Sequence, residues 1–135
     1  MKYISDSDMR TREIAGDLVK GLLNGSVVCL DGEMGAGKTV FVQGCMSALG
    51  YNGRVTSPTF ALCNEYRIGE KTVLHYDLCR IKDADDLYST GFYDSDADIV
   101  FVEWAGNSCD GFENAVRIRI SYGASENERV IEIDE

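Results

Sequence analysis

The chain has 135 residues, of which 44% are hydrophobic and only one is proline, and its formal net charge is −10. This length and composition indicate a single globular domain over residues 1–135 and exclude a disordered chain, while the acidic balance argues against stand-alone binding of nucleic acid. No apolar run is long enough to cross a bilayer and the first residues lack a signal-peptide core, so we expect a cytoplasmic protein without membrane contacts.

The first predicted element is a helix over residues 6–23. Its apolar residues recur at spacings of three and four, and Ser5 or Ser7 could cap its N-terminus. Residues 27–30 form a β-branched, apolar run that predicts a buried strand. After a glycine-rich loop the apolar spacing becomes helical again, so strand, loop and helix follow one another directly.

The loop between this strand and the second helix has the complete pattern G-x-x-x-x-G-K-[ST] of a phosphate-binding loop. Its glycines let the backbone direct N–H groups at an anion, and the helix N-terminus adds partial positive charge. Lys38 would contact the β- and γ-phosphates, and Thr39 would offer its hydroxyl to Mg²⁺. We therefore predict a nucleotide site whose loop residues are Met34, Gly35, Ala36, Gly37, Lys38 and Thr39.

The middle of the chain predicts a β-hairpin. Residues 60–68 alternate as in a strand, Gly69 and Glu70 make a tight turn, and residues 71–77 return. A short helix and three further strands complete the prediction, at residues 83–88, 99–102, 115–121 and 129–133. Together these elements predict a three-layer α/β fold of the P-loop NTPase type, with a mixed sheet that carries an inserted antiparallel hairpin.

Two carboxylates are candidates for the second metal-binding group that a phosphate loop needs. Glu103 ends the apolar run 99–102, and Asp77 ends the run before it. Because the run before Glu103 is the more apolar, we favour Glu103 for Mg²⁺, directly or through water, and a metal-shell or water-orienting role for Asp77. The alternative for each is a strand-end carboxylate in solvent.

Other residues in the second half leave their role open. Ser57 to Thr59 could form a loop that senses the γ-phosphate, or an ordinary proline turn. His75 has apolar neighbours and is expected to be a packed core histidine rather than a base. Trp104 could belong to the core or anchor a partner.

The cysteines give no sign of a metal site. There are five of them without a Cys-x-x-Cys pair, and there is a single histidine, so we expect neither a zinc site nor a disulfide framework. Cys29 and Cys45 lie in apolar runs and are expected to pack as small hydrophobic residues.

Four motifs in order resemble the bacterial TsaE (formerly YjeE) ATPase family, which is required for threonylcarbamoyladenosine (t6A) modification of tRNA. They are the loop at 32–39, S-P-T-F at 57–60, H-Y-D-L-C-R at 75–80 and V-E-W at 102–104. The sequence departs from the usual family pattern at Glu33, Cys79 and Ala105, where Asp, Tyr and Pro are common. None of these departures removes a group to which we assign catalysis.

The resemblance implies a role for each site residue. It implies an ATPase in which Lys38 contacts phosphate, Thr39 and Glu103 serve magnesium, Asp77 is needed for hydrolysis and Thr59 lies in a switch-like loop. Adenine would lie between the start of the first helix and the C-terminal strands, near Asp8, Thr11 and Arg129.

The resemblance also implies the partners. Members bind a complex of the proteins TsaD and TsaB, and ATP hydrolysis supports repeated turnover by that complex. tRNA would be held by these partners and reached only indirectly, which suits an acidic chain.

Three other functions use a similar loop. The main alternative is a small-molecule kinase, although no arginine-rich lid segment is evident in the sequence. A GTPase is disfavoured because no Asn-Lys-x-Asp motif occurs. The third is a binding module that holds ATP without hydrolysing it.

Overall fold

The computed structural model describes residues 1–22, 24–33, 35–56, 58, 63–78, 96–104 and 115–134. The elements in these ranges are β1 (Lys2–Ser5), α1 (Asp8–Lys20), β2 (Ser26–Gly32), α2 (Lys38–Ala48), β3 (Cys63–Ile68), β4 (Lys71–Asp77), β5 (Ile99–Glu103), β6 (Ala115–Tyr122) and β7 (Arg129–Asp134). The predicted helices and strands within these ranges are confirmed, with ends that shift by a few residues. β1 was not predicted, and the predicted helix over 83–88 lies outside the described residues.

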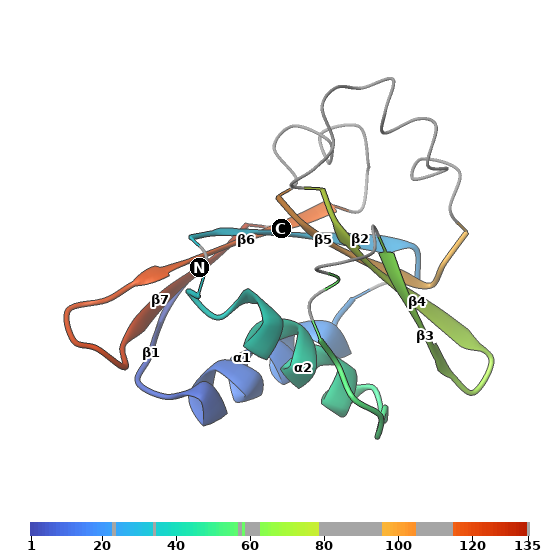
Figure 1. The fold of residues 1–135 in the computed structure, drawn as a ribbon, viewed down its shortest axis with the longest axis horizontal. Coiled ribbons are helices and arrows are strands. Elements are labelled where there is room, and N and C mark those ends of the chain that lie inside the picture. The colour runs from blue at the N-terminus through green and yellow to red at the C-terminus, as the bar shows by residue number, and fades with distance from the viewer. Residues whose placement is uncertain are drawn as a thin grey trace.

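All seven described strands form one sheet in the order β1-β7-β6-β2-β5-β4-β3 (Figure 1). The four central strands, β6, β2, β5 and β4, are parallel, whereas β3, β7 and β1 join by antiparallel pairing at the edges. The mixed sheet with an antiparallel β3–β4 hairpin is therefore as predicted.

The helices α1 and α2 cover the same face of this sheet (Figure 1). Val28 and Leu30 of β2 face them in the larger core cluster, while Val27 and Cys29 belong to a second cluster. Because successive side chains of a strand point to opposite faces, both faces of the sheet are apolar and buried, as expected for parallel strands.

Cys29 and Cys45 are both buried but differ in their bonding. Cys45 is a buried free thiol, and burial raises its pKa above the ordinary value. Cys29 is also buried, but it is disulfide-bonded, contrary to the expectation from the sequence.

Neither α1 nor α2 is long and apolar enough to cross a bilayer, and no other helix occurs in the described ranges.

The contact between α1 and α2 predicts a position that does not tolerate a side chain. A Cβ atom at Gly44 would lie 2.6 Å from Arg12 Cα and 3.0 Å from Ala15 Cβ. We expect Gly44→Ala to cost about 1–3 kcal/mol of overpacking, of which helix propensity returns at most about 1 kcal/mol. Urea unfolding measures the difference. Gly21→Ala is the matched control, because its nearest neighbour would be at 3.7 Å, and equal stability of the two variants would contradict the prediction.

Candidate functional site

Parallel pairing brings the predicted site residues to one edge of the sheet. β2 leads into the phosphate loop, and Leu30 of β2 is in register with Glu103 at the end of β5. Glu103 is in turn in register with Asp77 at the end of β4. Ligands of open α/β sheets bind at the carboxyl ends of parallel strands, which is where these groups meet.

The phosphate loop has the backbone conformation that its glycines permit. Gly35 and Gly37 have φ angles of 81° and 113°, in the left-handed region. α2 begins directly at Lys38, and Gly37 offers its first turn no side-chain cap. The first N–H groups of a helix lack partners within the helix and carry its partial positive charge. The loop is therefore built to receive an anion.

Lys38 is a buried cation beside this loop. The residue is 7% exposed, its Nζ donates a hydrogen bond to the Gly32 carbonyl at 2.8 Å, and it lies 4.2 Å from the centre of the Trp104 ring. Among the described residues no carboxylate forms an ion pair with it. A buried charge without a counter-ion is costly, so an anion in the loop would stabilise this ammonium group.

Trp104 reaches Lys38 because of an unusual backbone angle. Its φ is 58°, and within the described ranges no other residue except glycine has a positive φ. For a residue with a Cβ this conformation costs roughly 1–2 kcal/mol. The residue is 45% exposed, so it is not a core residue; a role as a partner anchor stays a prediction.

The Glu103 carboxylate bonds to His75, which the sequence predicted only as a packed core histidine. His75 is fully buried, as predicted, but its Nε2 lies 2.6 Å from Oε2 of Glu103, which is 4% exposed. His75 of β4 is in register with Phe101, two residues before Glu103 on β5, and residues two apart on a strand share a face. The spacing of His75 and Asp77 was visible in the sequence, but the register with β5 was not.

Arg129 lies at the phosphate loop, although from a distant part of the chain. Its Nε donates to the Ala36 carbonyl at 3.2 Å, and its Nη1 donates to two carbonyls of the preceding turn at 2.8 and 3.0 Å. The guanidinium also lies 4.6 Å from the centre of the Tyr122 ring. Arg129 therefore braces the loop against the β6–β7 hairpin.

The start of α1 comes close to Arg129 through the β1–β7 pairing. Ser5, at the end of β1, is in register with Arg129. Asp8 is exposed in the first turn of α1, whereas Thr11 is buried with its hydroxyl 2.7 Å from that of Ser5. The structure thus brings the segments predicted to flank adenine together at one side of the loop; the contact with a base stays a prediction.

Some predicted site residues lie outside the described residues. These are Met34 and Thr59, and the departures Cys79 and Ala105 also fall there. Thr39 is described and partly buried at the start of α2. Its hydroxyl and the Glu103 carboxylate are oxygen donors, the ligand type that Mg²⁺ prefers. In the described part of the chain no cluster of three His, Cys, Asp or Glu side chains could bind a metal by itself, so a metal here would also need nucleotide oxygens.

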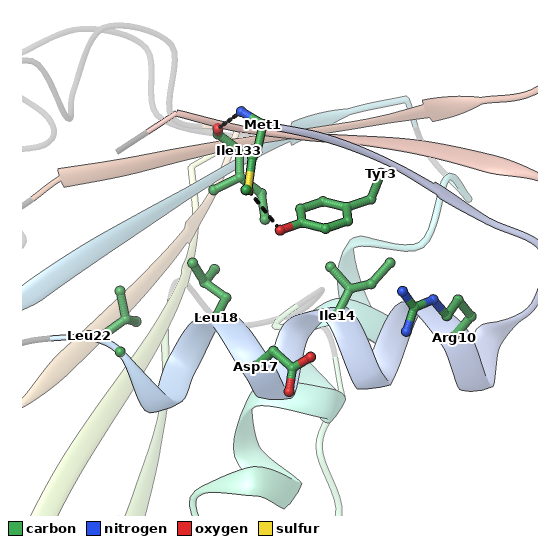
Figure 2. A pocket seen from close by; sticks show the side chains of 9 residues that line it. Met1, Tyr3, Arg10, Ile14, Asp17, Leu18, Leu22 and Ile133 are labelled. Carbon is green, nitrogen blue, oxygen red and sulfur yellow. Dashed lines mark hydrogen bonds between the residues drawn. The ribbon is translucent and has the colours of Figure 1, made fainter.

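A cavity of about 580 Å³ lies elsewhere, between α1 and the β1–β7 edge of the sheet. Figure 2 shows mostly apolar residues around it, from one side of α1 and from the facing chain: Met1, Tyr3, Ile14, Leu18, Leu22 and Ile133. No residue of the phosphate loop lines it, and its polar residues Arg10 and Asp17 do not bond to each other among the described contacts. Neither the phosphate-loop residues nor the strand-end carboxylates of the candidate site are among the residues that line this cavity.

Comparisons with known proteins agree with the motifs. The family model described as threonylcarbamoyl adenosine biosynthesis protein TsaE matches residues 5–131. A tRNA threonylcarbamoyladenosine biosynthesis protein TsaE from Rickettsia felis is 33% identical over 104 residues, which cover 76% of this chain but 61% of that protein. The same protein from Aquifex aeolicus is 38% identical over 105 residues, which cover 76% of this chain and 75% of its own length.

A solved structure supports the fold. The crystal structure of Bacillus subtilis YdiB superposes with a TM-score of 0.76 at 27% sequence identity, covering 97% of this chain and 82% of that one. The mixed sheet and its two helices therefore have a close counterpart in a solved protein, consistent with the predicted P-loop type of α/β fold.

Proposed function

Because this chain belongs to the TsaE family of threonylcarbamoyladenosine biosynthesis proteins, we propose that it is a P-loop ATPase that binds and hydrolyses Mg·ATP in support of tRNA modification. The observation that carries the proposal is the buried Lys38 ammonium in the phosphate loop, which forms no ion pair among the described residues, with the Glu103 carboxylate on the adjacent parallel strand. Such an arrangement suits a bound phosphate chain and its metal.

Each residue then has a defined task. Lys38 leaves the Gly32 carbonyl and the Trp104 ring and binds the β- and γ-phosphates. Thr39 and Glu103 hold Mg²⁺, which when bound neutralises charge that develops on the phosphate oxygens. Asp77, in register with Glu103, orients the attacking water.

The remaining residues position the loop and the base. The backbone from Met34 to Gly37 cradles the phosphates. Arg129 holds the Ala36 carbonyl and thereby fixes the peptide plane that carries the Gly37 N–H. Asp8 and Thr11 border the adenine, and Thr59 belongs to a loop that responds to the γ-phosphate.

The partners in this proposal are the TsaD and TsaB proteins in the cytoplasm. A net charge of −10 disfavours direct contact with tRNA, so tRNA is reached through these partners. The kinase alternative shares the loop, but family membership favours tRNA modification over a metabolite acceptor.

Removing the loop's cation should weaken nucleotide binding. We expect Lys38→Ala to lose about 10- to 150-fold in ATP affinity, because charge-assisted hydrogen bonds contribute about 1.5–3 kcal/mol. Titration calorimetry measures this, with Lys20→Ala, an exposed lysine at the end of α1, as the matched control. Equal affinity of the two variants would remove the phosphate loop from the proposal.

Removing either strand-end carboxylate should separate binding from hydrolysis. We expect Glu103→Gln and Asp77→Asn to keep their ATP affinity in EDTA within a few-fold but to release phosphate in Mg²⁺ at least about 10²-fold more slowly, since positioning of metal and water is lost. A phosphate-release assay beside calorimetry checks both. No loss in either variant, with release already at background in the wild-type protein, would support a binding module that does not hydrolyse ATP.

Hydrolysis by the isolated chain should be slow and should rise with its partners. Arg129 is the arginine seen bonded to the loop, and backbone carbonyls and the Tyr122 ring occupy its guanidinium. An arginine supplied in trans can add about 10³-fold or more. We expect ATP-dependent co-purification of TsaD and TsaB from native lysate and faster phosphate release when they are added. Fast turnover by the isolated chain would contradict this prediction, and capture of a metabolite pathway enzyme instead of TsaD and TsaB would favour the kinase.

A further inference from the structure

His75 is a buried polar residue to which the proposed function gives no task. Its imidazole is fully buried on the helix-covered face of the sheet, where Val73 and Phe101 are also buried. The Phe101 ring meets it edge to face, with centroids 6.5 Å apart and planes at 79°. A histidine in such surroundings needs a reason beyond hydrophobic packing.

The reason that the geometry offers is Glu103. The Nε2–Oε2 distance of 2.6 Å is short, as in a charge-assisted hydrogen bond. The backbone of Glu103 is fixed as well, because its carbonyl accepts a hydrogen bond from the Leu78 N–H at 3.0 Å. The carboxylate is therefore held at both its main chain and its head group.

The hydrogen bond determines which nitrogen of His75 carries the proton. An ionised carboxylate only accepts, so Nε2 is the donor. Nδ1 is buried and has no hydrogen-bond partner in the described part of the chain. The bond to Glu103 therefore uses the one ring nitrogen that has a hydrogen-bond partner among the described residues.

Stability alone does not account for this pair. A buried carboxylate costs desolvation free energy even when it is hydrogen-bonded, and the unpartnered Nδ1 adds a further cost. The pair also stands at the end of an otherwise apolar strand core, two residues from Asp77 and next to Trp104. This location indicates that the His75–Glu103 pair supports the candidate nucleotide site.

We propose that His75 is a positioning residue, whose Nε2–H hydrogen bond fixes the Glu103 carboxylate for the magnesium ion of the bound nucleotide. This inference rests on the proposed function, because it assumes that Glu103 serves that ion. Partners of this kind orient metal ligands, and their loss typically reduces metal affinity or activity 10- to 100-fold.

The decisive measurement is the gain in nucleotide affinity that Mg²⁺ provides. Calorimetry with a non-hydrolysable ATP analogue, with Mg²⁺ and with EDTA, gives this gain for each variant. In His75→Phe we expect the gain to fall about 10- to 100-fold while affinity in EDTA is unchanged. His75→Gln, whose amide can still donate, should keep the gain within a few-fold.

Val73→Ala is the matched structural control, because Val73 is buried on the same face of β4 and does not bond to Glu103. It should lose stability but keep the Mg²⁺ gain. A full gain in His75→Phe, or an equal loss in Val73→Ala, would overturn the inference. A wild-type protein without any Mg²⁺ gain would instead contradict the proposed role of Glu103.

A spectroscopic test needs no variant, because the chain has a single histidine. With ¹⁵N-labelled histidine we expect a slowly exchanging Nε2–H resonance. This resonance should shift when Mg²⁺ and the analogue are added together, and much less with the analogue in EDTA. An Nε2 without a proton, or equal shifts with and without Mg²⁺, would overturn the inference even if His75→Phe did not fold.

Discussion

The parallel register of β2, β5 and β4 is the constraint on which the site depends. It sets Leu30 opposite Glu103 and Glu103 opposite Asp77, so that three segments far apart in the sequence end at one sheet edge. Like charges in register repel each other, and two carboxylates here are favourable only with cations nearby. The Lys38 ammonium lies on the neighbouring loop, and its positive charge offsets this repulsion. A magnesium ion held with a bound nucleotide would do the same.

The polar groups at this edge are also paired by necessity, because the core beneath them is apolar on both faces. Lys38 bonds to a carbonyl and lies against an aromatic face, and Glu103 bonds to His75. Each of these contacts gives a buried polar group a partner. Burying that group still costs desolvation free energy, which an apolar residue in its place would not. Among the described residues, the buried groups that can carry a charge, Lys38, His75 and Glu103, gather toward the carboxyl ends of the strands.

Local patterns in the sequence were enough to predict most of the fold. The loop motif, the hairpin around Gly69 and the apolar run before Glu103 each depend on residues close together in the chain. β1 was missed because it is a short edge strand whose partner, β7, lies at the other end of the chain. The His75–Glu103 bond was missed for a related reason, since it requires the register of two strands whose connection is long.

The orientation of Trp104 was also beyond sequence reasoning, because a positive φ at a tryptophan is contrary to its backbone preference. That conformation is compensated in this structure by the contact of its ring with Lys38, a contact between oppositely polarised groups that strengthens when water is excluded. A phosphate in the loop competes for the same ammonium. If Lys38 turns to a bound phosphate as proposed, Trp104, the residue directly after Glu103, loses this contact, so the proposal links the state of the loop to the end of β5.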